Sequence, residues 1–266
     1  MDLGISGRTA LIFGGDSGIG WCTARVLLQE GATVILSDVD QDELDAAAQK
    51  LEANPGRLFA MAADVTDPAS LARLHADIAE RVGAVDILVQ SSGVTGAQGQ
   101  FHEIDEDGWR TTIDIDLLGP VWITREFLPD LRAGGWGRLV YLVSEDAVQP
   151  YDDELPYCAA KAGVLSMAKG LSRSYATEGL LVNTVSPAFI HTPMTDAMME
   201  KRAEQLGSSF DDAVDSFLDE ERPFLAQHRR GEPEEVANVI AFLCSDRSSF
   251  VNGSNYRVDG GSVATI

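Results

Sequence analysis

Short apolar segments alternate with longer helical segments along almost the whole chain. The apolar segments occupy residues 9–13, 33–37, 57–62, 86–89, 138–143, 181–185 and 255–258. Stretches with helical spacing separate them, at residues 18–29, 41–51, 106–131, 156–177 and 233–244 and after Pro68. Strands joined through helices run parallel, and the helices cover both faces of the sheet. The sequence therefore predicts an α/β fold with a doubly wound parallel sheet of about seven strands.

The 266 residues contain no linker, internal repeat or low-complexity tract that would divide them. Hydrophobic residues make up 45% and charged residues 23%, which is typical of a folded globular chain. We therefore expect one domain over residues 1–266, with an inserted segment at about 188–228.

The charge balance narrows the range of partners. Acidic residues number 42 and basic residues 20, which gives a formal net charge of −22. A surface this negative repels the phosphates of nucleic acids and the head groups of anionic lipids. No apolar run approaches the roughly 18 residues that a membrane-spanning helix needs. We expect neither a nucleic-acid partner nor a membrane partner.

Cysteine and histidine usage indicates a reducing compartment and no metal. Cys22, Cys158 and Cys244 are an odd number without CxxC spacing, and no signal peptide is visible at the N-terminus. The four histidines are scattered without metal-ligand spacing. These features predict a cytoplasmic protein without bound metal.

A glycine-rich turn follows the first expected strand and leads directly into a helix. Its residues are Gly14, Gly15, Asp16, Ser17, Gly18, Ile19 and Gly20. Glycines let the backbone approach a pyrophosphate closely, and the N–H groups at a helix N-terminus bind it. The spacing is wider than in the usual dinucleotide fingerprint, and a plain strand-to-helix turn is the alternative. We expect this turn to bind a dinucleotide.

Asp38 ends the second expected strand, 18 residues after Gly20. A carboxylate there accepts hydrogen bonds from the adenosine ribose hydroxyls and repels a 2′-phosphate. Asp16 adds a negative charge to the turn, and no Arg or Lys occupies positions 14–20 or 36–40. These residues favour NAD(H) over NADP(H) as the cofactor. The alternative is that Asp38 merely caps the following helix.

Tyr157 and Lys161 lie four residues apart in an expected helix and therefore share one of its faces. A neighbouring cation favours the phenolate, and lowering a tyrosine pKa from about 10 toward about 7 takes about 4 kcal/mol. Tyr157 would then act as a general acid or base near neutral pH. Ser144, at the end of the fifth expected strand, is placed to hydrogen-bond the same substrate oxygen. A solvated helix face is the alternative for the Tyr157–Lys161 pair.

Taken together and in this order, the motifs resemble those of the short-chain dehydrogenase/reductase family over essentially the whole chain. The matching landmarks are Gly14, Gly18, Ile19 and Gly20, Asp64 and Val65, Gly93, Ser144, Tyr157, Lys161, residues 183–187, Thr192, residues 231–235 and residues 258–261. The resemblance implies a Rossmann-like domain with strand order 3-2-1-4-5-6-7. It also implies an oxidoreductase that transfers a hydride between NAD(H) and a small secondary alcohol or ketone.

The resemblance further implies a role for each matching residue. Tyr157 would transfer the hydroxyl proton, Lys161 would lower the pKa of Tyr157 and bind the nicotinamide ribose, and Ser144 would orient the carbonyl group. Asp64 and Val65 would contact the adenine, the backbone near Gly93 the adenosine ribose, and Thr192 the carboxamide. The expected cofactor-binding residues are Gly14, Asp16, Ser17, Gly18, Ile19, Gly20, Asp38, Asp64, Val65, Ser92, Gly93, Tyr157, Lys161, Pro187 and Thr192.

Some positions depart from the family pattern. Gln90, Ser91 and Ser92 stand where Asn-Asn-Ala is usual, and Asp116 stands where the family's fourth catalytic residue, an Asn, is expected. That Asn typically holds a water that leads from the lysine toward solvent. An Asp also holds water, but its charge favours a charged Lys161. Asp116 is therefore a fourth catalytic candidate, and a helix-bend residue without a catalytic role is the alternative.

By the same resemblance, three loops form the substrate pocket, at residues 94–101, 145–155 and about 188–224. The second loop is expected to be mostly solvated, and its charge favours a neutral alcohol or ketone over a polyanion. Its acidic residues are Glu145, Asp146, Asp152, Asp153 and Glu154. The Met and Phe residues of the third loop pack either as core or as an apolar lid over the substrate.

Two other functions stay open. One is a reductase of 3-oxoacyl thioesters on a carrier protein or coenzyme A, which the net charge and the NAD preference oppose. The other is a non-catalytic dinucleotide-binding sensor or scaffold. Asp116 and the segment 90–92 favour the sensor, whereas intact Ser144, Tyr157 and Lys161 oppose it.

The resemblance implies a homotetramer or a homodimer, and we favour the tetramer. A chain this negative needs an apolar, charge-poor patch in order to associate. The helices at 106–131 and 156–177 offer such patches, the first of them at Leu117, Leu118, Val121 and Trp122.

Overall fold

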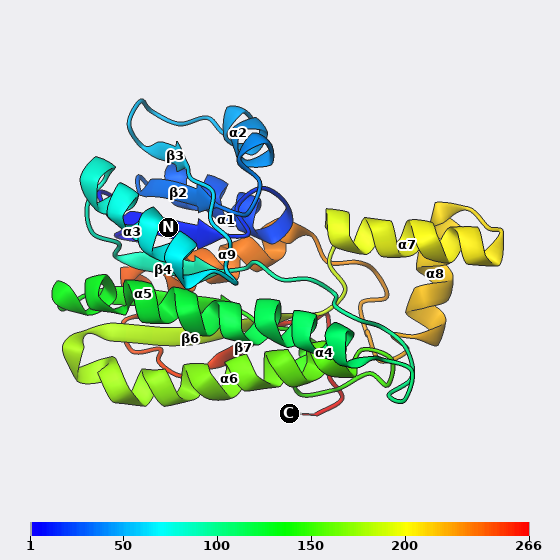
Figure 1. Ribbon diagram of the computed structural model, residues 1–266. Helices are drawn as coiled ribbons and strands as arrows, with labels where there is room; N and C mark the ends of the chain where they lie inside the picture. The colour runs from blue at the N-terminus through cyan, green and yellow to red at the C-terminus, as the bar shows by residue number, and fades with distance from the viewer. Residues whose placement is uncertain (1, 266) are drawn as a thin grey trace.

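The computed structural model describes residues 2–265 (Figure 1). Within them, seven strands form one sheet in the order β3-β2-β1-β4-β5-β6-β7, and each neighbouring pair runs parallel. The strands are β1 (Thr9–Phe13), β2 (Thr33–Ser37), β3 (Leu58–Ala60), β4 (Ile87–Gln90), β5 (Gly137–Leu142), β6 (Leu180–Pro187) and β7 (Asn255–Val258). The predicted fold class and strand order are confirmed.

Helices cover both faces of the sheet (Figure 1). One face carries α1 (Gly18–Gln29), α2 (Gln41–Gln49) and α9 (Pro233–Leu243), which bury Leu27, Leu44 and Ile240 against the strands. The other face carries α3 (Pro68–Arg81), α5 (Gly119–Ala133) and α6 (Leu155–Tyr175), which bury Ile78, Phe127 and Val164. Strands enclosed in this way are apolar on both sides, which explains why their sequences do not alternate.

The segment predicted as one helix over residues 106–131 is interrupted. It consists of α4 (Glu106–Ile113), a π-helical turn (Asp114–Leu118) and α5. Such turns often occur at functional sites because they redirect a side chain within a continuous helix. Here the side chain of Asp116 is fully buried, while Asp114 in the same turn is exposed.

The insert after β6 forms α7 (Pro193–Leu206) and α8 (Phe210–Glu220), which project from one end of the sheet (Figure 1). Met199, Phe217 and Leu218 pack with Phe189 and Leu225 in a small apolar cluster of their own. These residues of the insert are therefore core, as one of the two interpretations of the sequence expected.

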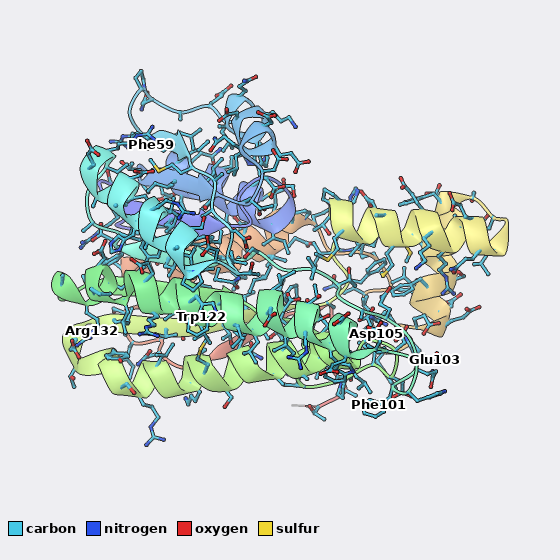
Figure 2. All side chains as sticks on the ribbon, viewed as in Figure 1. Phe59, Phe101, Glu103, Asp105, Trp122 and Arg132 are labelled. Carbon is cyan, nitrogen blue, oxygen red and sulfur yellow. The ribbon has the colours of Figure 1, made fainter. Side chains whose placement is uncertain are left out.

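The connection between β4 and α4 lies at the end of the molecule where α7 and α8 project. Figure 2 shows Phe101, Glu103 and Asp105 near the start of α4, whereas Arg132, in the last turn of α5, lies at the opposite end. The loops expected to surround a substrate are thus gathered at one end. Among the described residues, no helix has both the length and the apolar character that crossing a membrane requires.

Candidate active site

The carboxyl ends of β1, β4, β5 and β6 enclose a cleft of about 340 Å³ together with the start of α1. Its lining includes every expected cofactor-binding residue except Asp64 and Val65. The carboxylate of Asp64 instead accepts hydrogen bonds from the backbone N–H and the hydroxyl of Thr66, at 2.8 and 2.6 Å. The sequence motifs therefore predicted the residues that gather at this cleft, apart from Asp64 and Val65.

The turn from β1 into α1 has no room for side chains. A Cβ atom on Gly20 would collide with the carbonyl oxygen of Gly14, and one on Gly14 would lie 2.6 Å from the backbone nitrogen of Ser92. Ser17 is the N-cap residue of α1, but its side chain accepts no hydrogen bond from the helix. The first N–H groups of the helix therefore stay available to other acceptors. A pyrophosphate suits this turn because free N–H groups and the positive end of the helix dipole attract it, and the glycines let it approach the backbone closely. The residues present therefore fit a dinucleotide.

Asp38 lines the cleft at the end of β2. The helix that follows, α2, is capped by Asp40, whose carboxylate accepts hydrogen bonds from the N–H groups of Asp42 and Glu43. This excludes the interpretation of Asp38 as the helix cap. Burial raises the pKa of Asp38, and the nearby carboxylate of Asp16 adds to the rise.

Ser144 and Tyr157 meet at the inner end of the cleft. Ser144 follows β5 and caps a short 3-10 turn (Glu145–Ala147) by accepting a hydrogen bond from the N–H of Asp146, at 3.3 Å. Tyr157 stands in the first turn of α6. Both residues line the cleft and also a smaller cavity beside it, so they stand where the two cavities adjoin.

Lys161 lies one helical turn after Tyr157 and joins it to Asp116. Its Nζ is 5.3 Å from the centroid of the Tyr157 ring and 3.3 Å from Oδ1 of Asp116. The N–H of Val94 donates to the same carboxylate oxygen at 3.2 Å, while Oδ2 has no hydrogen-bond partner among residues 2–265. The structure therefore brings together all four residues expected to be catalytic, Ser144, Tyr157, Lys161 and Asp116.

The pKa of Tyr157 moves in the opposite direction from the expected one. Burial raises it well above its usual value, the carboxylates of Asp146, Asp116 and Glu154 add to the rise, and hydrogen bonding with Ser144 opposes it. Lys161 does not reverse this because its charge is paired with Asp116. Burial also raises the pKa of Asp116, and Lys161 opposes that rise. Tyr157 is consequently held in the protonated form, which can donate a proton.

The expectation that the loop after β5 is mostly solvated is wrong for three of its acidic residues. Asp152 and Asp153 are exposed, but Glu145, Asp146 and Glu154 are only 2%, 5% and 7% exposed. These three side chains line the smaller cavity next to Ser144 and Tyr157. Burial and the neighbouring carboxylate of Glu154 raise the pKa of Asp146 to about 7.

The sequence interpretation also missed Arg222. This residue follows α8 at the end of the insert, and its guanidinium reaches the same cavity. Its Nε lies 3.4 Å from Oε1 of Glu145, and its guanidinium lies 3.6 Å from the centroid of the Tyr151 ring. A buried carboxylate needs a partner of this kind, but nothing local in the sequence indicates which distant arginine supplies it.

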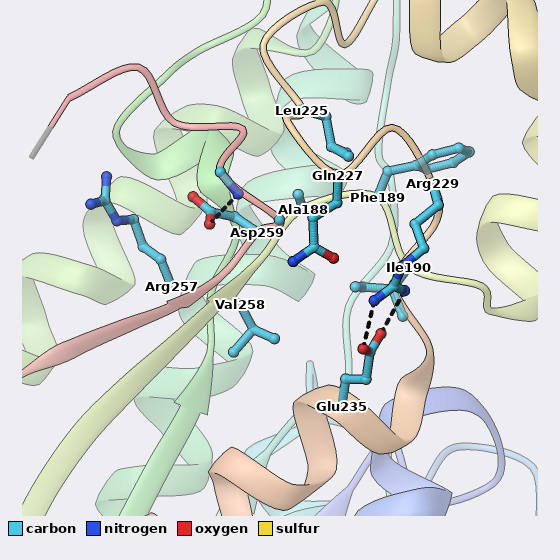
Figure 3. A pocket seen from close by; sticks show the side chains of 13 residues that line it. Ala188, Phe189, Ile190, Leu225, Gln227, Arg229, Glu235, Arg257, Val258 and Asp259 are labelled. Carbon is cyan, nitrogen blue, oxygen red and sulfur yellow. Dashed lines mark hydrogen bonds and ion pairs between the residues drawn. The ribbon is translucent and has the colours of Figure 1, made fainter.

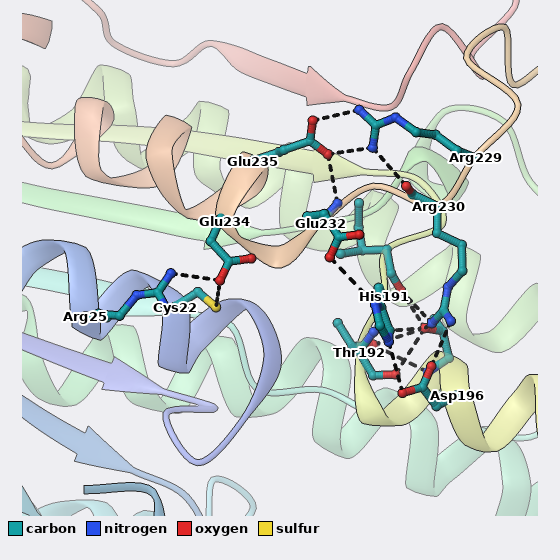
Figure 4. A network of polar contacts seen from close by, with 12 residues as sticks. Cys22, Arg25, His191, Thr192, Asp196, Arg229, Arg230, Glu232, Glu234 and Glu235 are labelled. Atoms are coloured by element: carbon teal, nitrogen blue, oxygen red, sulfur yellow. Dashed lines mark hydrogen bonds and ion pairs between the residues drawn. The ribbon is translucent and has the colours of Figure 1, made fainter. Parts of the chain in front are cut away.

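Thr192 is held at the start of α7 by a polar network (Figure 4). Its hydroxyl accepts a hydrogen bond from the N–H of Thr195, in a reciprocal cap of the helix. Arg230 hydrogen-bonds to the Thr195 hydroxyl and pairs with Asp196 at 2.8 Å. These contacts connect the beginning of the insert to the segment before α9 and keep Thr192 in the lining of the cleft.

A second cavity of about 340 Å³ lies beside β6 and β7 (Figure 3). Its charged residues already have partners. Arg229 makes two hydrogen bonds to Glu235, at 2.8 and 2.7 Å, and Asp259 accepts a hydrogen bond from the N–H of Gly261. Ser144, Tyr157 and Lys161 do not line it. We therefore place the candidate active site in the cleft rather than here.

A nucleotide-dependent oxidoreductase is defined by three features of this structure. They are the doubly wound sheet, the cleft that fits a dinucleotide, and the Ser, Tyr and Lys at the inner end of the cleft. A family model described as enoyl-(acyl carrier protein) reductase matches residues 14–263. The 3-oxoacyl-(acyl-carrier-protein) reductase FabG of Thermotoga maritima is 33% identical over 259 residues, which cover 97% of this chain and 99% of that protein.

Two further comparisons agree with this match. The cis-4-hydroxycyclohexanecarboxylate dehydrogenase of Sinomonas cyclohexanicum is 34% identical over 257 residues, with 97% of each chain covered. The crystal structure of L-sorbose reductase from Gluconobacter frateurii, complexed with NADPH and L-sorbose, is 31% identical, with a TM-score of 0.92 over all of both chains. The chain therefore belongs to the short-chain dehydrogenase/reductase family. It is an oxidoreductase whose cofactor is a nicotinamide dinucleotide.

The buried Asp146 carboxyl predicts a pH dependence of stability. Its pKa is about 7 in the folded protein and about 4 in an unfolded chain, so between these values only the folded state holds the proton. The resulting stabilisation is fully present below about pH 4 and is lost as the pH rises through about 7. The melting temperature of Asp146→Asn should therefore fall less between pH 5 and pH 8 than that of the wild type.

Thermal unfolding at a series of pH values measures this difference. Asp152→Asn, which removes an exposed carboxylate from the same loop, should retain the wild-type dependence. An Asp146→Asn variant with the wild-type slope would show that Asp146 is already ionised in the folded protein.

Proposed function

We propose that this chain transfers a hydride between NAD(H) and a small secondary alcohol or ketone. The observation that carries the proposal is the meeting of Ser144, Tyr157 and Lys161 at the point where the dinucleotide cleft joins a smaller cavity. A cofactor bound against the glycine turn and a substrate in the cavity would both reach the Tyr157 hydroxyl. A sensor or scaffold has no need of a proton donor at this junction.

Bound NADH supplies the hydride, and the side chains of the protein supply positioning and the proton. Tyr157, held protonated by its surroundings, gives its hydroxyl proton to the carbonyl oxygen as the carbonyl carbon receives the hydride. Ser144 donates a hydrogen bond to the same oxygen. One hydride and one proton convert the ketone to a secondary alcohol, and the proton on Tyr157 is then replaced from solvent.

Lys161 and Asp116 have supporting roles in this proposal. Lys161 binds the nicotinamide ribose and places a positive charge beside the Tyr157 ring. Asp116 holds Lys161 in that position as a buried counter-charge. Through this charge Asp116 also sets the pH range over which Tyr157 gives up its proton, a role that an Asn at this position would not have.

We also propose that residues 1–266 act as one dinucleotide-binding and catalytic domain with a lid at about 188–228. Met194 and Met198 of the insert line the cavity beside Tyr157, and Met194 is 44% exposed. Flexible, partly exposed thioethers suit a segment that closes over a substrate. The three free cysteines, all buried, support a reducing, cytoplasmic setting.

A reductase of 3-oxoacyl thioesters is the second candidate, and the relative from Thermotoga maritima favours it. The net charge of −22 opposes docking of an acidic carrier protein. A comparison of acetoacetyl-coenzyme A with small ketones, followed by NADH absorbance, separates the two candidates. A much higher kcat/KM for the thioester would favour the second.

Removing the hydroxyl of Tyr157 should abolish most turnover but not cofactor binding. Tyr157→Phe keeps the ring and loses only the proton donor, so we expect kcat to fall by about 100-fold or more. Fluorescence titration should show that NADH still binds. Lys161→Ala should lower both kcat and NADH affinity because it has two functions. A Tyr157→Phe enzyme with a nearly normal rate would remove Tyr157 from the mechanism.

Replacing Asp116 by Asn should shift the pH profile of alcohol oxidation. Oxidation needs ionised Tyr157, and the Asp116 charge is one of the causes that raise the pKa of Tyr157. In Asp116→Asn that pKa falls, so the rising limb of kcat/KM should move to lower pH. Asp114→Asn, which changes an exposed carboxylate of the same π turn, is the control. Identical profiles for wild type and Asp116→Asn would contradict this role.

The enzyme should bind NADH more tightly than NADPH. The carboxylates of Asp38 and Asp16 line the cleft, where they would repel a 2′-phosphate. Asp38→Ser should narrow the difference, whereas Asp42→Asn, on the exposed start of α2, should not. Fluorescence titration of the three proteins with both cofactors measures the six affinities. Equal or tighter binding of NADPH by the wild type would refute the assignment of NADH as the preferred cofactor. The titration needs to include NADPH because the similar L-sorbose reductase was crystallised with it.

We propose a homotetramer as the working assembly. An interface along the π turn and the start of α5 is supported by four half-buried apolar residues, Leu117, Leu118, Val121 and Trp122. Val164 and Ala168, in contrast, are buried against the sheet. Light scattering should give about four times the chain mass of 28.6 kDa. A mass of one chain at micromolar concentration would refute association.

A further inference from the structure

The smaller cavity beside Ser144 and Tyr157 has a volume of about 90 Å³ and a lining of two kinds of side chain. The apolar ones include Phe189, Met194 and Met198. The charged ones are three buried carboxylates and one arginine, namely Glu145, Asp146, Glu154 and Arg222. Because the cavity opens beside the proton donor, whatever fills it lies next to the reacting carbon.

Arg222 forms an ion pair with one of the carboxylates, Glu145. Its Nε lies 3.4 Å from Oε1 of Glu145, which also accepts a hydrogen bond from the Tyr151 hydroxyl at 3.0 Å. The guanidinium stacks over the ring of Tyr151, and Nη1 donates to the carbonyl oxygen of Glu221. Arg222 and Glu145 therefore neutralise each other.

Asp146 and Glu154 are left without a cation. Among residues 2–265, no Lys, Arg or His nitrogen forms an ion pair with either carboxylate. Glu154 accepts one hydrogen bond from the neutral amide of Gln98, at 2.8 Å. Asp146 is 95% buried and receives no hydrogen bond from a backbone N–H, an amide or a guanidinium. Its polar neighbours are the Ser144 hydroxyl and the carboxyl of Glu154.

Two adjacent buried carboxyls that form no ion pair of their own are costly for the folded protein. Burial raises the pKa values of both, and Arg222 opposes the rise without reversing it. The cost falls when a cation enters the cavity. A metal ion does not fit, because the described part of the chain holds no group of three or more His, Cys, Asp or Glu side chains arranged to bind one. A protonated amine needs only two acceptors and an apolar wall for its carbon atoms.

We propose that the cavity selects substrates that carry a protonated amine close to the reacting carbonyl or hydroxyl group. The inference rests on the proposed function, because it assigns Ser144 and Tyr157 to the reacting oxygen. The ammonium group donates hydrogen bonds to Asp146 and Glu154 and displaces the proton that the pair otherwise holds. The carbon body lies against Met194, Met198 and Phe189. The redox step is unchanged: the carbonyl carbon takes a hydride, and its oxygen takes the proton of Tyr157.

A pair of ketones with the same shape and different charge tests this selection. Aminopropan-2-one carries a protonated primary amine near pH 7, which can donate to both carboxylates, and butan-2-one replaces the ammonium group by a methyl group. A third ketone, hydroxypropan-2-one, offers a neutral hydroxyl. Since hydrogen bonds to charged groups contribute about 1.5–3 kcal/mol, kcat/KM with NADH should be at least about tenfold higher for the amino ketone than for either neutral ketone.

Variants show whether the preference comes from the proposed pair. In the double variant Asp146→Asn with Glu154→Gln, the ratio of the two kcat/KM values should fall to about one. Asp152→Asn, from the exposed part of the same loop, should keep the wild-type ratio. A neutral ketone that is turned over as well as the amino ketone, or a ratio that survives the double variant, would overturn the inference.

Calorimetry with the Tyr157→Phe variant and NADH makes the result independent of turnover. The amino ketone should bind more tightly than its carbon analogue, and the double carboxylate substitution on the same background should remove the difference. Equal binding of the two ketones overturns the inference. Tight amine binding without turnover of any ketone by the wild type would instead contradict the proposed function and leave the charge selection standing.

Discussion

Every neighbouring pair of strands in the sheet runs parallel, so the chain must return through a helix to the same starting edge before each new strand. All of the strands consequently end at one edge of the sheet. The residues that follow these ends come together although they are far apart in the sequence. They are the glycine turn after β1, Asp38 after β2, Ser92 and Gly93 after β4, Ser144 after β5, and Thr192 after β6. The cleft is thus a consequence of the sheet's connectivity.

The inner end of the cleft depends on a second constraint, the burial of charge. Lys161 is only 4% exposed, and the carboxylate it needs comes from the π turn between α4 and α5. That turn is what directs Asp116 inward. In the same way, Glu145 is buried because Arg222 returns from the insert to meet it. Each contact joins segments that are distant in the sequence. The site therefore depends both on the π turn, which supplies Asp116, and on the insert, which supplies Arg222.

The parts of the structure that local sequence determines were predictable. Apolar runs and helical spacing indicated the parallel sheet, and the glycine turn indicated the cleft. The strand order was implied by the family resemblance, and the spacing of Tyr157 and Lys161 placed both on one helix face. The capping of α2 by Asp40 then excluded one of the two interpretations of Asp38 that the sequence left open, that of a helix cap. What the sequence did not reveal was the burial of Glu145, Asp146 and Glu154. Acidic residues in a polar loop are usually solvated, and the arginine that changes this lies outside the loop.

The same buried charge explains why the expected direction of the Tyr157 pKa was wrong. A lysine four residues away favours the phenolate only while its own charge is unbalanced, and here Asp116 balances it. The carboxylates of Asp146 and Glu154 add further negative potential at Tyr157. These carboxylates and the burial of the ring thereby hold Tyr157 in its protonated form. A cationic substrate between Tyr157 and this carboxylate pair would offset part of the negative potential, so that substrate charge and proton transfer would be coupled through the same three side chains.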